Sequence, residues 1–128
     1  NPDIRVALDL TQEWQKVAGA DHPLAMGVTI VNAEFLANNQ AAVDNFLTEM
    51  DASVAFTNGN LDEASSLIEK YEIMSANVAK AAVPACNIVS LQGEKMKTAV
   101  ASFLEVMYNS NPKSIGGKLP DEKIYYIQ

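Results

Sequence analysis

The chain has 128 residues, of which 48% are apolar, a proportion that is ordinary for a globular unit and too high for a disordered one. Sixteen acidic residues outnumber nine basic ones, so the formal net charge is −7, and Arg5 is the only arginine. Nucleic acid and anionic lipid both select basic surfaces, so this charge balance disfavours nucleic-acid binding and docking on a lipid surface.

Two apolar segments near the beginning of the chain favour β-strands. In the first, four apolar residues alternate with less apolar ones, which is the period of a strand with one buried face: Ile4, Val6, Leu8 and Leu10. The second, residues 24–31, is almost continuously apolar, as in a strand covered on both faces. Gly27 interrupts it, and a glycine inside a strand often marks a close approach of the backbone to a ligand.

The residues between and after these segments favour helices. Thr11 is expected to cap a short helix that Gly19 ends, and Asn32 to cap another short turn. Asn38 or Asn39 is expected to cap a longer helix, which has apolar residues at steps of three and four: Val43, Phe46, Leu47, Met50 and Val54.

The second half of the chain continues this pattern. Asn60 followed by Glu63 resembles a capping box, and the helix after it is expected to bury an apolar set: Leu61, Ala64, Leu67, Ile68 and Tyr71. Ser75 is expected to cap a weaker helix that ends at Pro84, and a last long helix is expected over about residues 94–108. The tail that follows ends in Tyr125 and Tyr126, which we expect to dock on the body of the protein.

The order of these elements indicates an α/β fold: a strand, a short helix, a second strand, and then mainly helices. Two strands do not make a stable sheet alone, so their remaining partners are expected in polypeptide N-terminal to this chain. We therefore divide the chain into residues 1–31, two crossing strands with a short helix, and residues 32–128, a helical part.

Few residues are suited to catalysis or metal binding. His22 is the only histidine and Cys86 the only cysteine, and a zinc site needs three or four such ligands. We expect His22 to be a solvated loop residue and Cys86 a buried, inert thiol. The acidic pairs, such as Asp62 with Glu63, lie where helices are expected to begin and complement the helix dipole there. The sequence thus predicts no catalytic residue, no metal, no cofactor and no enzymatic activity.

Trp14 is the sole tryptophan, and it lies between the two expected strands. A packing residue of the core is the first interpretation, and an aromatic wall of a ligand cleft is the second.

Taken in order, several blocks of the sequence resemble the solute-binding proteins of nitrate/sulfonate/taurine ABC importers, a family that includes proteins for thiamine precursors. The likeness lies in residues 8–14, in residues 26–31 followed by Glu34, Phe35, Leu36 and the helix 41–50, and in residues 87–93 and 114–126. The resemblance implies the C-terminal portion of a type II periplasmic-binding-protein fold, in which two lobes hold a ligand. It also implies that Met26 and Gly27 lie near the cleft, so the ligand-binding candidates are Trp14, Met26 and Gly27.

The function that the resemblance implies is the extracytoplasmic solute-binding component of an ABC importer. Its partners would be a small-molecule ligand and the permease of the cytoplasmic membrane, and it would lie in the periplasm or on the cell surface as a lipoprotein. Two alternatives stay open: a self-contained acidic helical interaction module, and a fragment of an enzyme of the related pyrimidine-synthesis branch.

Overall fold

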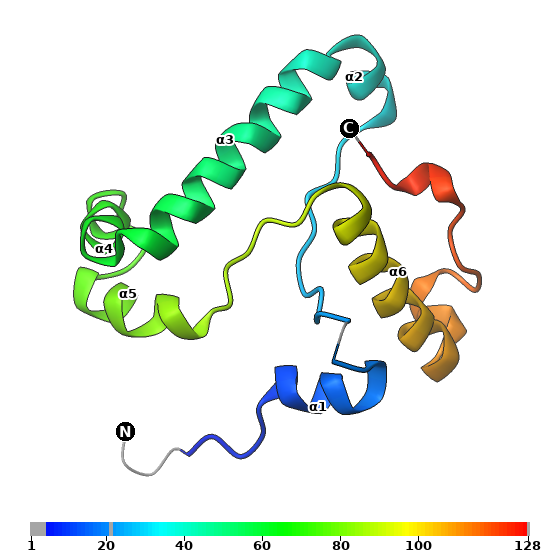
Figure 1. Ribbon diagram of the computed structural model, residues 1–128, viewed down its shortest axis with the longest axis horizontal. Helices are drawn as coiled ribbons and strands as arrows, with labels where there is room; N and C mark the ends of the chain where they lie inside the picture. Colours follow the sequence, from blue (N-terminus) through cyan, green and yellow to red (C-terminus); the bar gives the residue numbers. More distant parts are fainter. Residues whose placement is uncertain (1–4, 21, 128) are drawn as a thin grey trace. The chain divides into compact units, whose positions relative to one another are not determined.

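A computed structural model describes residues 5–20 and 22–127 of the chain, and Figure 1 shows its helices. Six are α-helices: α1 (Leu10–Ala18), α2 (Ala33–Asn38), α3 (Gln40–Gly59), α4 (Leu61–Lys70), α5 (Ala76–Ala82) and α6 (Gly93–Ser110). Three are short 3₁₀ helices: η1 (Val83–Ala85), η2 (Pro112–Ile115) and η3 (Glu122–Ile124). Residues 5–20 and 22–127 contain no strand.

The prediction of an α/β fold with two strands is therefore wrong, and with it the type II periplasmic-binding architecture. Of the first expected strand, Ile4 lies outside the described residues, the next residues are irregular, and Leu10 already belongs to α1. Residues 24–31 are irregular throughout. An apolar period of two favours a strand only when a neighbouring strand supplies hydrogen bonds, and the described part of the chain offers neither segment such a neighbour.

Both segments are instead exposed to solvent. The exposed fraction is 89% for Val6 and 88% for Ile30, and Val28 is also largely exposed. Because a folded chain normally removes such side chains from water, these segments are the least covered apolar parts of the described residues.

The contacts divide the chain into two compact units. The first joins the residues up to Ile30 with those from Leu91 onward, and the second comprises Val31–Ser90. The sequence predicts a division between residues 31 and 32. That division separates expected strands from expected helices and not two compact units, so it stays a prediction.

In the first unit, α1 contacts α6, and α6 contacts η2 in the tail. The cap of α1 is Asp9, not Thr11 as expected, because the Asp9 carboxylate accepts hydrogen bonds from the backbone N–H groups of Thr11 and Gln12 at 2.9 and 3.1 Å. The helix ends at Gly19, as predicted, where the backbone has a φ of 94°.

In the second unit, the chain runs from α2 through α3 to the neighbouring helices α4 and α5. Asn32 caps α2, as predicted, by accepting hydrogen bonds from Glu34 and Phe35. Asn60 stands at the N-cap of α4, but the predicted capping box is absent because its side-chain amide donates back to the carbonyl of Phe56 at 3.3 Å.

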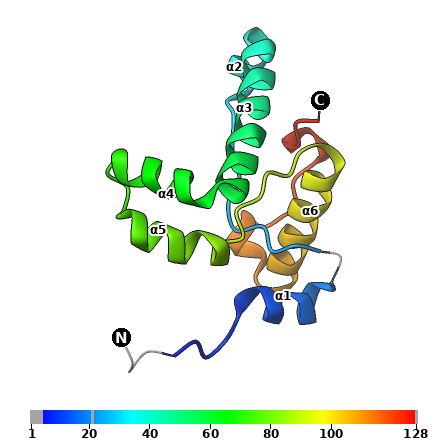
Figure 2. The ribbon, with the colours of Figure 1, turned by 60° about the vertical axis from the view of Figure 1, so that its left-hand side comes forward.

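The buried residues between α4 and α5 are small. Figure 2 shows the two helices side by side, joined by a turn. Ala64 and Ser65 of α4 and Ala79 of α5 are buried, as is Val83 of η1. Most of the larger residues expected to be buried on α4 are not, and Tyr71 is 69% exposed. Close approach of the backbones thus takes the place of the expected packing of large side chains.

The turn after α4 is a Schellman motif with an unusual residue. The N–H of Ile73 bonds the carbonyl of Ile68 at 3.1 Å, and that of Glu72 bonds Glu69 at 2.9 Å. Glu72 has a φ of 57°, a left-handed conformation that glycine usually occupies at this place. A Cβ in that conformation meets the following carbonyl oxygen, so the turn carries local strain.

We predict that Glu72→Gly raises the free energy of unfolding by about 1 kcal/mol, because glycine adopts this conformation without a steric cost. Urea unfolding followed by circular dichroism measures the change. Asn87→Gly is the matched control: Asn87 also has a positive φ, of 50°, but asparagine tolerates it, so the gain is much smaller. Equal gains in the two variants, or none at Glu72, would contradict the assignment of strain.

Candidate functional site

Trp14, one of the three predicted ligand-binding residues, has a packing role in the structure. Its ring lies 5.3 Å from the ring of Phe103 on α6, tilted by 32°, which is a favourable aromatic geometry. Its Nε1–H donates a hydrogen bond of 3.0 Å to the backbone carbonyl of His22. Trp14 therefore holds α1 against α6 and anchors the loop that follows α1.

Met26 and Gly27, the other two candidates, lie in the exposed segment 24–31. Met26 is 78% exposed, and a Cβ placed on Gly27 would meet no atom within 4 Å. The space around Gly27 is open, so a ligand or another chain could approach its backbone closely. Two hollows among the described residues are lined by other side chains, so the grouping of Trp14, Met26 and Gly27 in one site stays a prediction.

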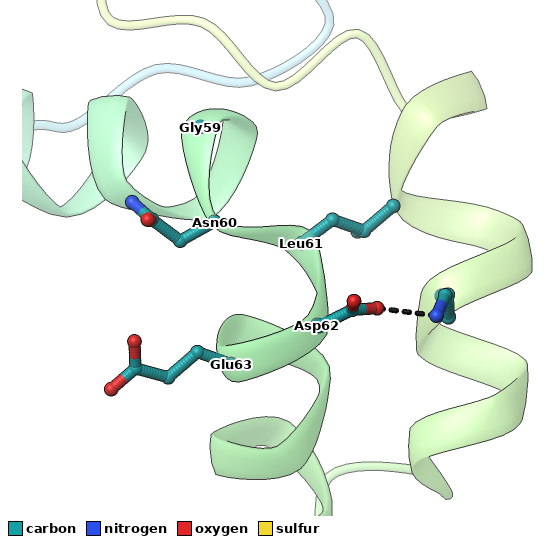
Figure 3. Close-up of a pocket in the computed structure, with 6 residues that line it drawn as sticks. Gly59, Asn60, Leu61, Asp62 and Glu63 are labelled. Atoms are coloured by element: carbon teal, nitrogen blue, oxygen red, sulfur yellow. Dashed lines mark ion pairs between the residues drawn. The ribbon is translucent and has the colours of Figure 1, made fainter.

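The first hollow lies in the second unit, at the beginning of α4 (Figure 3). It is open to solvent, has a volume of about 430 Å³, and is lined by Gly59, Asn60, Leu61, Asp62, Glu63 and Lys80. Figure 3 shows Asp62 pointing toward α5, where it forms an ion pair with Lys80, whereas Glu63 points away from that helix. Both partners are well exposed, so the pair links α4 to α5 but contributes little stability.

The second hollow lies in the first unit beside α6. Its volume is about 390 Å³, and it is lined by Pro23, Leu91, Glu94, Lys95, Thr98 and Ala99. It combines apolar surface with a carboxylate, an ammonium group and a hydroxyl. This set of groups can form hydrogen bonds with a polar molecule.

The tail is held on α6 by an ion pair. Lys97 of α6 pairs with Glu122 of η3, and Tyr125 and Tyr126 are half-buried, in agreement with a docked tail. The hydrogen bond that the Lys97 ammonium donates to the Glu122 carboxylate raises the pKa of Lys97 above its ordinary value, and the charges of Glu122, Glu94 and Tyr125 add to the rise.

Two further predictions about single side chains are wrong. Cys86 is exposed rather than buried, because it follows the short η1 helix at the surface of the second unit. His22 is half-buried rather than solvated, and its Nδ1 has no hydrogen-bond partner among the described residues. Trp14 binds the His22 carbonyl, and the His22 ring lies beside Gly19, where an added Cβ would be 3.7 Å from its Cδ2.

No group of three or more His, Cys, Asp or Glu side chains in residues 5–20 and 22–127 is placed to hold a metal ion. None of the helices in that part of the chain combines the length and apolar character that crossing a membrane requires. Compared with protein-family models, with curated proteins and with solved structures, the chain matches none.

Sequence reasoning missed two features: the buried hydroxyl of Ser65 and the strained Glu72. A sequence signal for the strained Glu72 lies in residues 71–74. They follow a helix and contain no glycine, so a residue with a side chain takes the αL position.

We predict that Trp14→Phe lowers the free energy of unfolding by about 1 kcal/mol, because it keeps the ring and loses the hydrogen bond to His22. Trp14→Ala should lower it by about 3 kcal/mol, because it also removes the contact with Phe103. Urea unfolding followed by circular dichroism compares the two variants with the native chain. Two variants as stable as the native chain would show that Trp14 does not hold α1 in place.

The raised pKa of Lys97 predicts that alkaline solution weakens its ion pair with Glu122. A group whose pKa is raised by folding contributes stability that is complete below its unfolded pKa, ordinarily 10.5, and that is lost as the pH rises through the folded value. NMR titration of ¹³C-labelled lysine side chains measures this pKa directly. Glu122→Gln should lower the pKa of Lys97. Glu105→Gln, which removes one negative charge from α6, should not. An equal change of the Lys97 pKa in the two variants would refute the pairing.

Proposed function

We propose that this chain acts in solute import, as part of the extracytoplasmic solute-binding component of an ABC importer. In this role it binds a small molecule and passes it to the permease, makes and breaks no covalent bond, and uses no cofactor. It works in the periplasm or as a lipoprotein on the cell surface. The proposal concerns the function and not the fold, because the predicted α/β architecture is wrong.

The observation that carries the proposal is the exposure of the uncharged segment 24–31. Met26, Val28 and Ile30 are exposed, and the backbone of Gly27 is open. An apolar stretch of this kind marks a surface that binds something, and it coincides with the block that resembles the importer proteins. Met26 would supply adaptable apolar contact, and Gly27 would let the solute reach the backbone.

The absence of charge in this segment also limits the ligand. Backbone N–H and C=O groups are the main polar groups that this segment offers to a ligand. These groups suit a small polar or zwitterionic solute held by hydrogen bonds better than a multiply charged one.

The proposal predicts that the purified chain binds a small solute through residues 24–31. Native mass spectrometry after gentle purification, followed by isothermal titration with nitrate, taurine and an aminopyrimidine, tests it. Gly27→Val should weaken binding of the responding solute about tenfold by blocking access to the backbone. Gly59→Val should not, because Gly59 has equally open surroundings but lies at the end of α3. A chain that carries no small molecule and responds to none of the three solutes would contradict solute import.

A self-contained acidic helical interaction module is the second candidate, and the helical structure favours it. Helices α2 to α5 also expose apolar side chains, among them Phe35, Phe46 and Val78. This function predicts binding of polypeptide and no response to small solutes, so the same titrations separate the two candidates.

A further inference from the structure

The negative charge of the protein is concentrated in the second unit. Residues 31–90 contain eight acidic residues and only two basic ones, Lys70 and Lys80, so they carry a net charge of −6 out of the total of −7. Lys80 is moreover paired with Asp62. The second unit therefore produces a negative potential that attracts cationic partners and repels anionic ones.

The same unit exposes apolar side chains at the turn between α4 and α5. Figure 2 shows this turn at one end of the helix pair. We call it the turn patch and define it by Tyr71, Glu72, Ile73, Met74 and Val78. Tyr71 and Ile73 are 69% and 67% exposed, and Met74 and Val78 are also exposed. The Nζ atom of Lys70 lies 6.0 Å from the centre of the Tyr71 ring. Exposed large apolar side chains that are close together in the chain are typical of a protein-binding surface.

The turn patch is held in a fixed conformation. The two hydrogen bonds of the Schellman motif fix Glu72 and Ile73, and the Glu69 carboxylate accepts a hydrogen bond of 3.2 Å from the N–H of Ala76 at the start of α5. A surface that is already ordered loses less conformational entropy on binding than a flexible one.

We propose that the turn patch binds a basic amphipathic segment of another protein, with apolar side chains on Tyr71 and Ile73 and lysine or arginine side chains beside Glu72. The charge selects this occupant. A second copy of the chain would bring a second net charge of −7 to the interface, and an anionic membrane would be repelled in the same way. The inference goes beyond solute import and does not depend on it, since residues 24–31 take no part.

Fluorescence anisotropy with a labelled helical peptide of about 18 residues, built from leucine and lysine, tests the proposal on the full chain. The expected result is saturable binding that weakens when the salt concentration rises from about 0.05 to about 0.5 M, because screening acts on exposed charges. A peptide with glutamate in place of every lysine should not bind. Equal binding of the two peptides would overturn the proposal.

Substitutions locate the site. Tyr71→Ser should weaken binding about tenfold through lost apolar contact, and Glu72→Lys about fivefold through repulsion. Lysine in the left-handed conformation is as strained as glutamate, so Glu72→Lys should leave the fold unchanged, and circular dichroism checks both variants. Glu105→Lys makes the same change of net charge on α6 and should change the affinity less than twofold, or by about 0.4 kcal/mol. Full affinity of the two turn variants would overturn the proposal, as would an equal loss in Glu105→Lys.

Discussion

Backbone hydrogen bonds made within single helices stabilise the described part of this chain, and most other features follow from that. A helix satisfies its own N–H and C=O groups, so it needs no neighbour for them, whereas a strand needs another strand. Asp9, Asn32 and Asn111 each satisfy backbone N–H groups where a helix begins. The apolar segment 24–31 forms neither a helix nor a strand, and it is left irregular and largely exposed.

The two proposals rest on different surfaces in different units. Solute binding is assigned to residues 24–31, where charge is absent and the backbone of Gly27 is open. Protein binding is assigned to the turn patch, where exposed apolar side chains lie in an acidic unit. Each surface is exposed and apolar, but the charge around it differs, and charge decides which kind of partner each one selects.

Local signals predicted the helices well and the strands wrongly. Gly19 and Asn32 act as predicted because helix ends depend on residues within one turn. The strand predictions are wrong because an alternation of apolar residues such as Val6 and Leu8 does not show whether a partner strand is present. Among the site residues, Trp14 had two interpretations from the sequence, core packing and the wall of a ligand cleft. Its contacts with Phe103 and His22 show a packing role, and its part in a ligand site stays a prediction. The exposure of Cys86 depends on tertiary contacts that no local pattern contains. The strained turn at Glu72 is local, because no glycine follows α4 at the left-handed position.

The central claim is that residues 24–31 are exposed to solvent in the free protein, while the helices before and after them in the chain are formed. Hydrogen–deuterium exchange resolved to single peptides tests it most directly, because amides outside regular structure exchange rapidly and helical amides in a packed unit do not. The account predicts rapid exchange over residues 24–31 and slow exchange over the buried part of α4 and α5. Protection of residues 24–31 equal to that of α4 would mean that they are hydrogen-bonded and covered, and would contradict the account.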